Sequence, residues 1–315
     1  MALKVLAHFV PGEKVLDFVA PESDWLDIRY CADDDDDTFY RELPDAEVIW
    51  HVLRPLSDSD LERASRCRLV QKLGAGVNTI DVEAASRLGI AVANMPGANA
   101  ASVAEGAVLL MLAALRRLPE LDRATRAGAG WPSDHSLGET VRDIGGCTVG
   151  LIGYGNIAKR VETIVTAMGA DVLHTSTGDD GRPGWRTLPD LLATSEIVSL
   201  HLPLTPDTSK LLDAAALALM KPGAVIVNTS RGPIIDEDAL IDALRGGRLA
   251  AGLDVFAVEP IPADNPLLGL DNVVLTPHVT WYTVDTMRRY LAEAVDNCRR
   301  IRDGRDLRNV VNSSE

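Results

Sequence analysis

Short runs of β-branched and other apolar residues alternate with longer segments rich in Ala and Leu along nearly the whole chain. The short runs have the length of strands, and the longer segments can form helices that cross back over a sheet. Such alternation is typical of parallel sheets covered by helices on both faces. We therefore predict an α/β fold with strands that begin near residues 4, 47, 69, 90, 147, 171, 196, 224, 249 and 272.

The chain has 315 residues, which is more than one core usually holds, so two domains are expected. A single large α/β domain is the alternative. The break should fall near NMPGAN, where Pro96 and Gly97 end a strand before a helix predicted over 102–118. A second long helix, predicted over 283–303, closes the chain and can pack back on the first domain.

Charge and cysteine usage exclude several classes of partner. The formal net charge of −15 repels phosphate backbones and anionic lipid, so we expect no nucleic-acid and no membrane partner. No apolar run reaches the roughly 18 residues of a membrane span, and MALKVLAHFV is too short for a secretory signal, which predicts a cytoplasmic protein. The four cysteines are scattered, so neither disulfides nor a metal site are expected. The acidic run 33–37 can chelate a cation but is more typical of a solvated loop.

The segment TVGLIGYGNIAKRV has the pattern of a strand, a glycine turn and a helix. Gly153 permits the tight turn, Gly155 lets backbone amides approach a pyrophosphate, and Ala158 lets the helix lie close to the strand. The partial positive charge at the helix N-terminus then faces the phosphates. The pattern predicts a dinucleotide site that includes Gly153, Gly155, Asn156 and Ile157.

The end of the next strand should select the dinucleotide. An acidic residue about 20 positions beyond the glycines accepts the ribose hydroxyls of NAD and repels a 2′-phosphate. This strand ends near the uncharged Ser176. Ser176, Thr177 and Arg182 can donate to a 2′-phosphate, whereas Asp179 and Asp180 oppose it. We therefore expect NADP(H) or NAD(H), with a slight preference for NADP(H); a solvent-facing loop is the alternative for Arg182.

Three more segments, NTSRG, LDVFAVEP and NVVLTPH, end strands in the second half of the chain. Since ligands in open α/β sheets lie outside the carboxyl ends of the strands, Arg231, Glu259 and His278 are expected to converge. A histidine can give and retake the proton of a carbonyl that is reduced, a carboxylate can orient it, and an arginine matches a substrate carboxylate. The set predicts hydride transfer between a 2-keto acid and a 2-hydroxy acid. A surface ion pair, a loop carboxylate and a core histidine are the alternatives for the three residues.

These motifs resemble the D-isomer-specific 2-hydroxyacid dehydrogenases over almost the whole chain. The resemblance runs from LVQKLGAGVNTID through GLIGYGNIA, VSLHLPLTPDTSKLL and NTSRGPIIDEDAL to DVFAVEP and TPH. It implies that Arg231 binds the substrate and that Glu259 supports the acid–base residue His278. It also implies that backbone amides around Ala75 and Gly76 receive the substrate carboxylate.

The same resemblance implies the architecture. We expect two doubly wound parallel-sheet domains with a cleft between them. One is a flavodoxin-like substrate domain of residues 1–98 plus 284–315, and the other is a Rossmann dinucleotide-binding domain of residues 99–283. A homodimer joined through the nucleotide domains is implied as well, and Trp131 lies in the segment that resembles the dimerisation arm.

Further cofactor residues are expected around the same strand ends. His201 lies in a segment that resembles the loop beside the adenine half of the cofactor, and we group Pro203, Thr208 and Thr229 with it. Asp254 is placed to meet the nicotinamide carboxamide, and capping a turn is the alternative role.

Other candidates concern the substrate side of the site. Arg54, with His51, can line the first domain's side of the cleft and is expected to bind substrate. Trp281 stands where many relatives have a small residue, and it is expected to narrow the pocket or stack on the substrate; packing in the hinge is the alternative. The Trp281–Tyr282 pair is similar to one in the C-terminal-binding-protein corepressors. The remaining histidines are expected to be structural or exposed: His8, His135 and His174.

The leading prediction is an NAD(P)-dependent reductase of small 2-keto acids such as glyoxylate or hydroxypyruvate. A nucleotide-sensing interaction protein of the corepressor type, with little turnover, is the alternative from another class. A relative that oxidises formate or phosphite is a third possibility.

Overall fold

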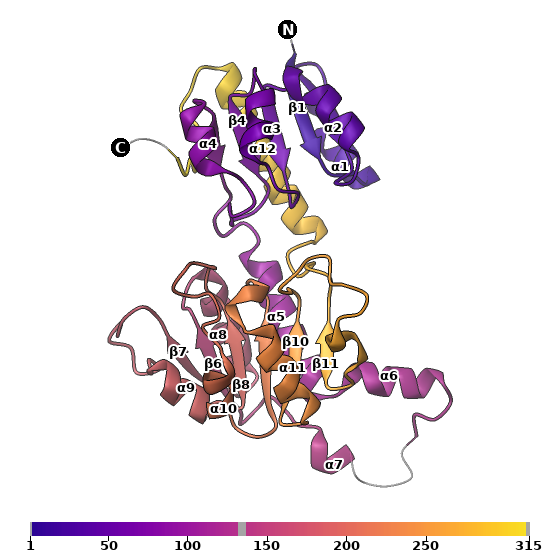
Figure 1. Ribbon diagram of the computed structural model, residues 1–315, viewed down its shortest axis with the longest axis vertical. Coiled ribbons are helices and arrows are strands. Elements are labelled where there is room, and N and C mark those ends of the chain that lie inside the picture. Colours follow the sequence, from indigo (N-terminus) through magenta and orange to yellow (C-terminus); the bar gives the residue numbers. More distant parts are fainter. Residues whose placement is uncertain (1, 132–136, 313–315) are drawn as a thin grey trace. The chain divides into compact units, whose positions relative to one another are not determined.

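The computed structural model describes residues 2–131 and 137–312 and divides into two compact units (Figure 1). The first unit comprises Met1–Asn99 and Tyr282–Glu315, and the second comprises Ala100–Trp281. The predicted boundaries, after residues 98 and 283, differ from these by one and two residues. The chain therefore returns to the first unit at its C-terminal end.

The first unit is built on a five-stranded parallel sheet with the strand order β2-β1-β3-β4-β5. Its strands are β1 (Leu3–His8), β2 (Leu26–Cys31), β3 (Val48–His51), β4 (Leu69–Lys72) and β5 (Ala91–Ala93). This is the flavodoxin-like order, in which the chain reverses direction across the sheet beside the first strand. Strand β2 was not predicted, because the prediction relied on continuous apolar runs, whereas this edge strand alternates apolar residues with Asp27 and Arg29.

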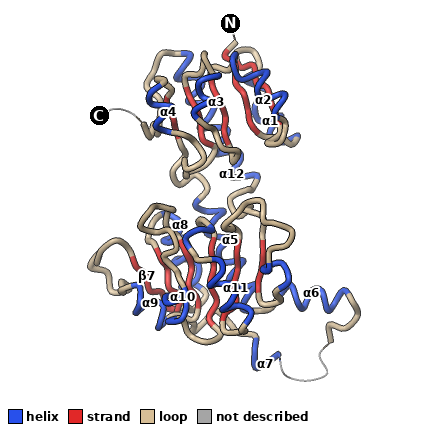
Figure 2. Tube along the Cα trace, viewed as in Figure 1, coloured by secondary structure: helices blue, strands red, loops and turns tan. Residues whose placement is uncertain are grey.

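Helices cover the first sheet (Figure 2). They are α1 (Glu13–Val19), α2 (Asp36–Glu42), α3 (Asp58–Arg63), α4 (Val82–Arg87) and α12 (Val284–Arg302), with short 3₁₀ turns at Ala20–Glu22 and Leu43–Asp45. Helix α12 begins after Thr283, whose hydroxyl accepts the Thr286 amide. Its buried Asn297 donates to Gln71 on β4 at 2.6 Å, so the C-terminal helix is part of the first core.

The acidic run 33–37 is only partly the loop that was expected. Asp36 and Asp37 form the first turn of α2, and the Asp35 carboxylate accepts the Thr38 amide at 3.0 Å. Negative charge is favourable at a helix N-terminus, which explains why the run starts a helix. Among the described residues, no cluster of three or more His, Cys, Asp or Glu side chains could hold a metal ion.

The second unit contains a six-stranded parallel sheet in the order β11-β10-β9-β8-β6-β7. The strands are β6 (Thr148–Ile152), β7 (Asp171–Thr175), β8 (Ile197–Leu200), β9 (Ala224–Asn228), β10 (Leu249–Leu253) and β11 (Val273–Leu275). A single parallel bridge joins His174 to Trp185 at the outer edge of β7. That bridge stands where the third strand of the usual dinucleotide-binding order would lie. The predicted fold of two doubly wound parallel sheets is confirmed.

Helices lie on both faces of the second sheet (Figures 1 and 2). They are α5 (Ala100–Leu115), α6 (Leu118–Arg126), α7 (Leu137–Thr140), α8 (Asn156–Ala167), α9 (Leu188–Thr194), α10 (Ala214–Leu219) and α11 (Glu237–Arg245), with 3₁₀ turns at Gly232–Ile234 and Pro266–Gly269. Helix α5 is apolar on nearly all sides because it is buried against β9, β10 and α8. It ends three residues before the predicted 118, where Arg117 adopts a left-handed backbone.

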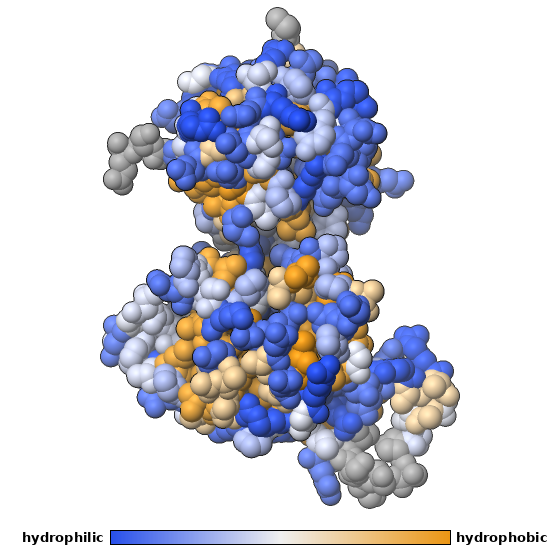
Figure 3. All heavy atoms as spheres, in the orientation of Figure 1, coloured by the Kyte–Doolittle hydropathy of each residue, from blue (hydrophilic) through white to orange (hydrophobic). Residues whose placement is uncertain are grey.

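The visible surface of the first unit is mainly hydrophilic. Hydrophilic side chains cover most of the first unit in the view of Figure 3. None of the helices in the described part of the chain combines the length and apolar character needed to cross a membrane.

Two of the minor histidines are buried. His8 stacks on Phe39 with ring centroids 4.6 Å apart, and His174 stacks on Tyr154 at 4.0 Å. Both are therefore structural in the sense that was expected. His135 lies outside the described residues.

His51, at the end of β3, is fully buried next to a cation. Its Nε2 lies 2.5 Å from the Arg54 carbonyl oxygen, and its Nδ1 lies 3.3 Å from the Lys72 ammonium. Burial, with the charge of Lys72, lowers the pKa of His51 from 6.5 to about 3. The ring is therefore neutral in the folded protein at neutral pH.

Acid should destabilise the first unit through His51. The unfolded chain binds a proton at this ring below about pH 6.5 and the folded chain does not, so the free energy of unfolding should fall as the pH drops below that value. The slope contributed by one such group is at most about 1.4 kcal/mol per pH unit. We expect His51→Asn to flatten the pH dependence of urea unfolding between about pH 6.5 and 5. Parallel slopes for both proteins would contradict this assignment.

Candidate active site

Three ionisable side chains lie beyond the carboxyl ends of neighbouring strands in the second unit. Arg231 follows β9, Glu259 lies in the loop after β10, and His278 follows β11. The His278 Nδ1 is 2.7 Å from Glu259 Oε2. The charge of Arg231 also acts on the Glu259 carboxyl. The structure thus brings these three predicted residues together.

The Glu259 carboxylate is held in its ionised form. Burial by itself would raise the pKa of Glu259, but the hydrogen bond and charge of His278, the Phe256 amide and the charge of Arg231 outweigh it. The pKa therefore lies below its ordinary value. Because an ionised carboxylate only accepts hydrogen bonds, the proton of the contact lies on His278 Nδ1. The other ring nitrogen, Nε2, makes no hydrogen bond to any residue that the structure describes.

Arg231 is positioned by a compact polar turn. The Asn228 side chain donates to the Arg231 carbonyl and accepts the Ser230 amide, each at 2.9 Å. The Ser230 hydroxyl donates to the Leu200 carbonyl at 2.7 Å, which ties the turn to β8. A Cβ at Gly232 would collide with the Phe256 backbone, so the turn and the loop after β10 are in direct contact. Burial lowers the pKa of Arg231, and the charge of Glu259 opposes that shift.

The roles of Asn228 and Ser230 were missed by the sequence reasoning. The sequence does contain an indication of these roles, since both are polar residues of NTSRG at the end of a buried strand. Such residues either meet a ligand or fix the backbone that presents one.

Asp254, predicted as a cofactor ligand, caps a turn. Its carboxylate accepts Thr276 Oγ1 and Thr280 Oγ1 at 2.6 Å each, the Val279 amide at 2.9 Å and the Thr280 amide at 3.1 Å. These four hydrogen bonds match the lone pairs of a carboxylate. The turn-capping alternative therefore describes the contacts of Asp254, and contact with the nicotinamide carboxamide stays a prediction.

The glycine turn has the geometry of a phosphate site. Gly153 has φ +86° and a Cβ there would lie 2.5 Å from the His201 carbonyl oxygen, so only glycine fits. A Cβ at Gly155 would meet no atom within 4 Å, which leaves room next to the N-terminus of α8. Ala158 is fully buried between helix and strand. Asn156 and Ile157 form the first turn of that helix.

Two buried groups that directly follow β8 and β9 have no hydrogen-bond partner among the described residues. They are the ring nitrogens of His201 and the hydroxyl of Thr229. Burial lowers the pKa of His201 to about 4, so its ring is neutral. Buried polar groups are normally satisfied, and such orphans fit a polar ligand. Pro203 and Thr208 instead bond to each other, with the Thr208 hydroxyl 2.7 Å from the Pro203 carbonyl oxygen.

The loop after β7 contains the residues expected to select the dinucleotide. The Ser176 hydroxyl donates to the Gly178 carbonyl at 2.8 Å, and Thr177 is exposed. Asp179 accepts the Gly181 amide at 2.8 Å, so its carboxylate is turned into its own loop.

The second acid of that loop is paired. Asp180 lies 3.0 Å from His174 Nε2 and 3.7 Å from Arg182 Nε. The Arg182 guanidinium stands over the Tyr154 ring, 4.8 Å from its centroid. Since Tyr154 belongs to the glycine turn, this cation–π contact joins the two segments that border an adenosine ribose in such folds.

The candidate substrate ligands of the first unit are the backbone amides of Ala75 and Gly76 and the side chain of Arg54. The amides of Ala75 and Gly76 donate to no described residue, while the Ala75 carbonyl accepts Asn94 Nδ2 at 2.7 Å. Arg54 forms an ion pair with Asp36 and lies 4.5 Å above the Phe39 ring. Free amides suit an anion, and the Arg54 guanidinium, although paired with Asp36, has a buried Nη1 without a hydrogen-bond partner among the described residues.

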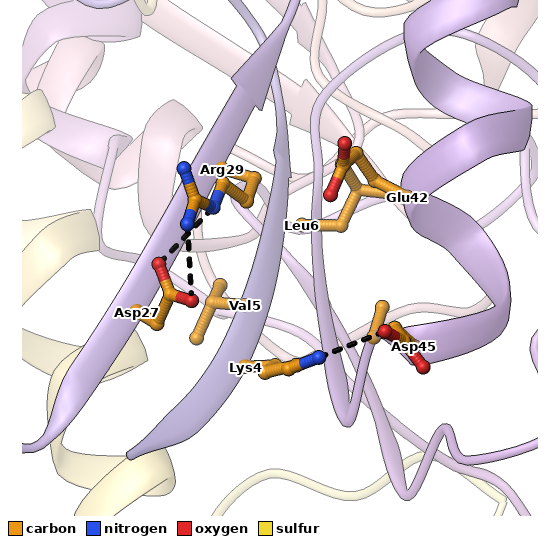
Figure 4. Close-up of a pocket in the computed structure, with 8 residues that line it drawn as sticks. Lys4, Val5, Leu6, Asp27, Arg29, Glu42 and Asp45 are labelled. Carbon is orange, nitrogen blue, oxygen red and sulfur yellow. Dashed lines mark hydrogen bonds and ion pairs between the residues drawn. The ribbon is translucent and has the colours of Figure 1, made fainter.

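Another hollow on the first unit has no such features. Lys4 pairs with Asp45 at 2.8 Å and Arg29 pairs with Asp27 at 3.1 Å along its wall (Figure 4). Both of its cations are thus paired with carboxylates of the same wall, so we assign it no function. Trp131, on the second unit, is 94% exposed.

Comparison with known proteins places the chain among oxidoreductases. Residues 108–280 match the family model of the D-isomer specific 2-hydroxyacid dehydrogenase NAD binding domain. The glyoxylate reductase of Aeropyrum pernix is 38% identical over 290 residues, which cover 88% of this chain and 86% of that protein. The D-3-phosphoglycerate dehydrogenase of Mycobacterium tuberculosis is 36% identical over 304 residues, which cover 93% of this chain but only 56% of that protein. The chain thus spans little more than half the length of the mycobacterial relative.

The solved structures agree. The crystal structure of the TT0316 protein from Thermus thermophilus has a TM-score of 0.90 and 32% sequence identity. The match covers 98% of this chain and all of that one.

Alanine at the two glycines of the turn should have different effects. Gly153→Ala places a side chain at positive φ against a carbonyl oxygen, so it should lower the melting temperature. Gly155→Ala meets no protein atom, so it should leave the melting temperature unchanged and weaken dinucleotide binding by about tenfold or more. Circular dichroism and titration calorimetry measure the two effects. Equal dinucleotide affinity in Gly155→Ala and the native protein would remove the turn from the site.

Proposed function

The chain belongs to the D-isomer specific 2-hydroxyacid dehydrogenase family, and from this we propose that it is an NAD(P)-dependent oxidoreductase that interconverts a small 2-keto acid and the D-2-hydroxy acid. The observation that carries the proposal is the 2.7 Å contact between His278 and an ionised Glu259 beside Arg231. Such a pair next to a dinucleotide turn is suited to moving a proton while a hydride moves.

Each residue has a role that follows from its chemistry. When bound, the reduced nicotinamide supplies the hydride. His278 donates a proton from Nε2 to the carbonyl oxygen in reduction and takes it back in oxidation. Glu259 orients the ring through Nδ1 and stabilises its charged form. Arg231 offers a planar fork of donors that fits a carboxylate and polarises the adjacent carbonyl.

We also propose that the Ala75 and Gly76 amides receive the substrate carboxylate. Their lack of protein acceptors among the described residues supports this role. Arg54 stays a candidate substrate ligand, although its pairing with Asp36 makes it the weaker one.

The proposed substrates are glyoxylate and hydroxypyruvate. The similarity to the Aeropyrum glyoxylate reductase, which extends over most of both chains, supports them. The keto acid that corresponds to D-3-phosphoglycerate belongs in the same test, given the mycobacterial relative.

For the cofactor we propose a preference for NADP(H) over NAD(H). The family model describes an NAD-binding domain, so the preference for NADP(H) rests on the loop after β7. An uncharged Ser176, an Asp180 that is paired with His174, and an Arg182 held over Tyr154 together favour a 2′-phosphate.

We propose that the protein is a cytoplasmic homodimer without a nucleic-acid or membrane partner. The four cysteines are free thiols, which suits a reducing compartment. The net charge of −15 disfavours anionic polymers. Whether Trp131 reaches a partner's site is part of the same proposal, and its 94% exposure leaves its side chain available.

The activity can be tested directly. We expect the purified protein to oxidise NADPH or NADH with glyoxylate, hydroxypyruvate or another member of a 2-keto-acid panel. His278→Asn should lower kcat/KM by about a hundred- to ten-thousand-fold, because it removes the acid–base group, with dinucleotide affinity unchanged. Dinucleotide binding without turnover of any keto acid would favour the corepressor-type interaction protein instead.

The cofactor preference has its own test. Ser176→Asp should shift the ratio of NADPH to NADH affinities toward NADH, since a new carboxylate repels the 2′-phosphate and accepts the ribose hydroxyls. Arg182→Ala should weaken NADPH binding and spare NADH. Fluorescence titration measures both, and an unchanged affinity ratio in both variants would show that the ribose contact lies elsewhere.

A further inference from the structure

We infer that Trp281 is a positioning residue, which keeps His278 against Glu259 through a hydrogen bond from the indole N–H to the His278 carbonyl. The inference rests on the proposed function and deepens it. It assigns to Trp281 an action through another side chain, in addition to any contact with substrate.

The backbone of His278 needs such support. His278 has φ +54°, in the left-handed region that residues other than glycine adopt uncommonly, although His, Asn and Asp do so more often than the rest. Residues held in this region persist only where their surroundings determine the conformation. The conformation matters here because the same residue directs Nδ1 to Glu259 at 2.7 Å.

Asp254 holds the chain on both sides of His278 but makes no hydrogen bond to the His278 carbonyl. Its carboxylate binds the chain on both sides of the histidine, at Thr276 and at Val279 and Thr280. Its backbone carbonyl accepts the His278 amide at 2.7 Å. Helix α5 confines the same turn, since a Cβ at Gly106 would lie 2.6 Å from the Thr280 side chain.

The His278 carbonyl oxygen is bound by Trp281. Its Nε1 donates to the His278 carbonyl oxygen at 3.0 Å. The Trp281 side chain thus bonds back to the backbone of residue 278, three positions earlier in the same turn. Without this donor, the peptide between His278 and Val279 is held only by the hydrogen bond of the Val279 amide to Asp254, and we expect the imidazole to shift away from Glu259.

The two possible roles of Trp281 use different parts of its side chain. A wall of the substrate pocket needs the aromatic surface, whereas the positioning role needs the N–H, which is the only polar group of indole. Phenylalanine keeps much of the surface and lacks the donor. The substitution therefore separates the two roles.

The experiment compares Trp281→Phe with the native protein on glyoxylate and on phenylpyruvate. We expect kcat to fall about tenfold on both, the equivalent of about 1.4 kcal/mol, with KM and dinucleotide affinity nearly unchanged. Thr280→Val, which removes a different hydrogen bond of the same turn, should reproduce the effect in weaker form.

Native turnover is measured first, so a failure of the proposed function is seen before any variant is compared. A native-like kcat in Trp281→Phe would overturn the inference, as would a rise in KM that depends on the substrate side chain. If Trp281→Phe does not fold, β-(3-benzothienyl)alanine introduced at position 281 keeps the indole shape without the N–H. The same loss of kcat with that residue supports the positioning role, and native kcat refutes it.

Discussion

The hydrogen bond between His278 and Glu259 depends on the parallel pairing of two short strands. Ala251, Gly252 and Leu253 of β10 pair with Val273, Val274 and Leu275 of β11, so the loops that follow both strands leave the sheet at the same edge. A shift of one residue in either strand would turn its side chains to the opposite face and move its loop. The buried apolar residues of this sheet therefore determine where an imidazole and a carboxylate can meet.

The polar groups at this edge fall into two sets. One set is saturated within the protein: Asp254 by the turn around His278, and Asn228 by the turn around Arg231. The other set has unused hydrogen-bonding capacity among the described residues, as in the ring of His201 and the hydroxyl of Thr229. The saturated groups hold the backbone rigid, and the unsatisfied groups mark where a polar ligand would be stabilised. The separation lets an acidic protein present a few directed donors to an anion without a broad positive surface.

Much of this arrangement could be predicted from the sequence, because it follows from apolar runs and from the rule that parallel strands end at one edge. Ten of the strands appear as such runs, and NTSRG, LDVFAVEP and NVVLTPH contain the carboxyl ends of three of them. Strand β2 was missed because, as an edge strand, it alternates apolar residues with Asp27 and Arg29 and forms no continuous apolar run. Turn capping by Asp254 was among the roles that the sequence offered, whereas the hydrogen bond of the Trp281 indole could not be foreseen, since it depends on the left-handed turn at His278. Proline before that histidine signals a turn but not the handedness of the residue after it.

The central claim is that Arg231, Glu259 and His278 surround one reducible carbonyl next to a nicotinamide. A crystal structure with bound NADP(H) and oxamate, a carboxylate that resembles a 2-keto acid, tests it most directly. The account predicts the oxamate carbonyl oxygen within hydrogen-bond distance of His278 Nε2 and of the Arg231 guanidinium, with Glu259 still on Nδ1. Oxamate bound away from these side chains, or His278 turned from the nicotinamide ring, would contradict it.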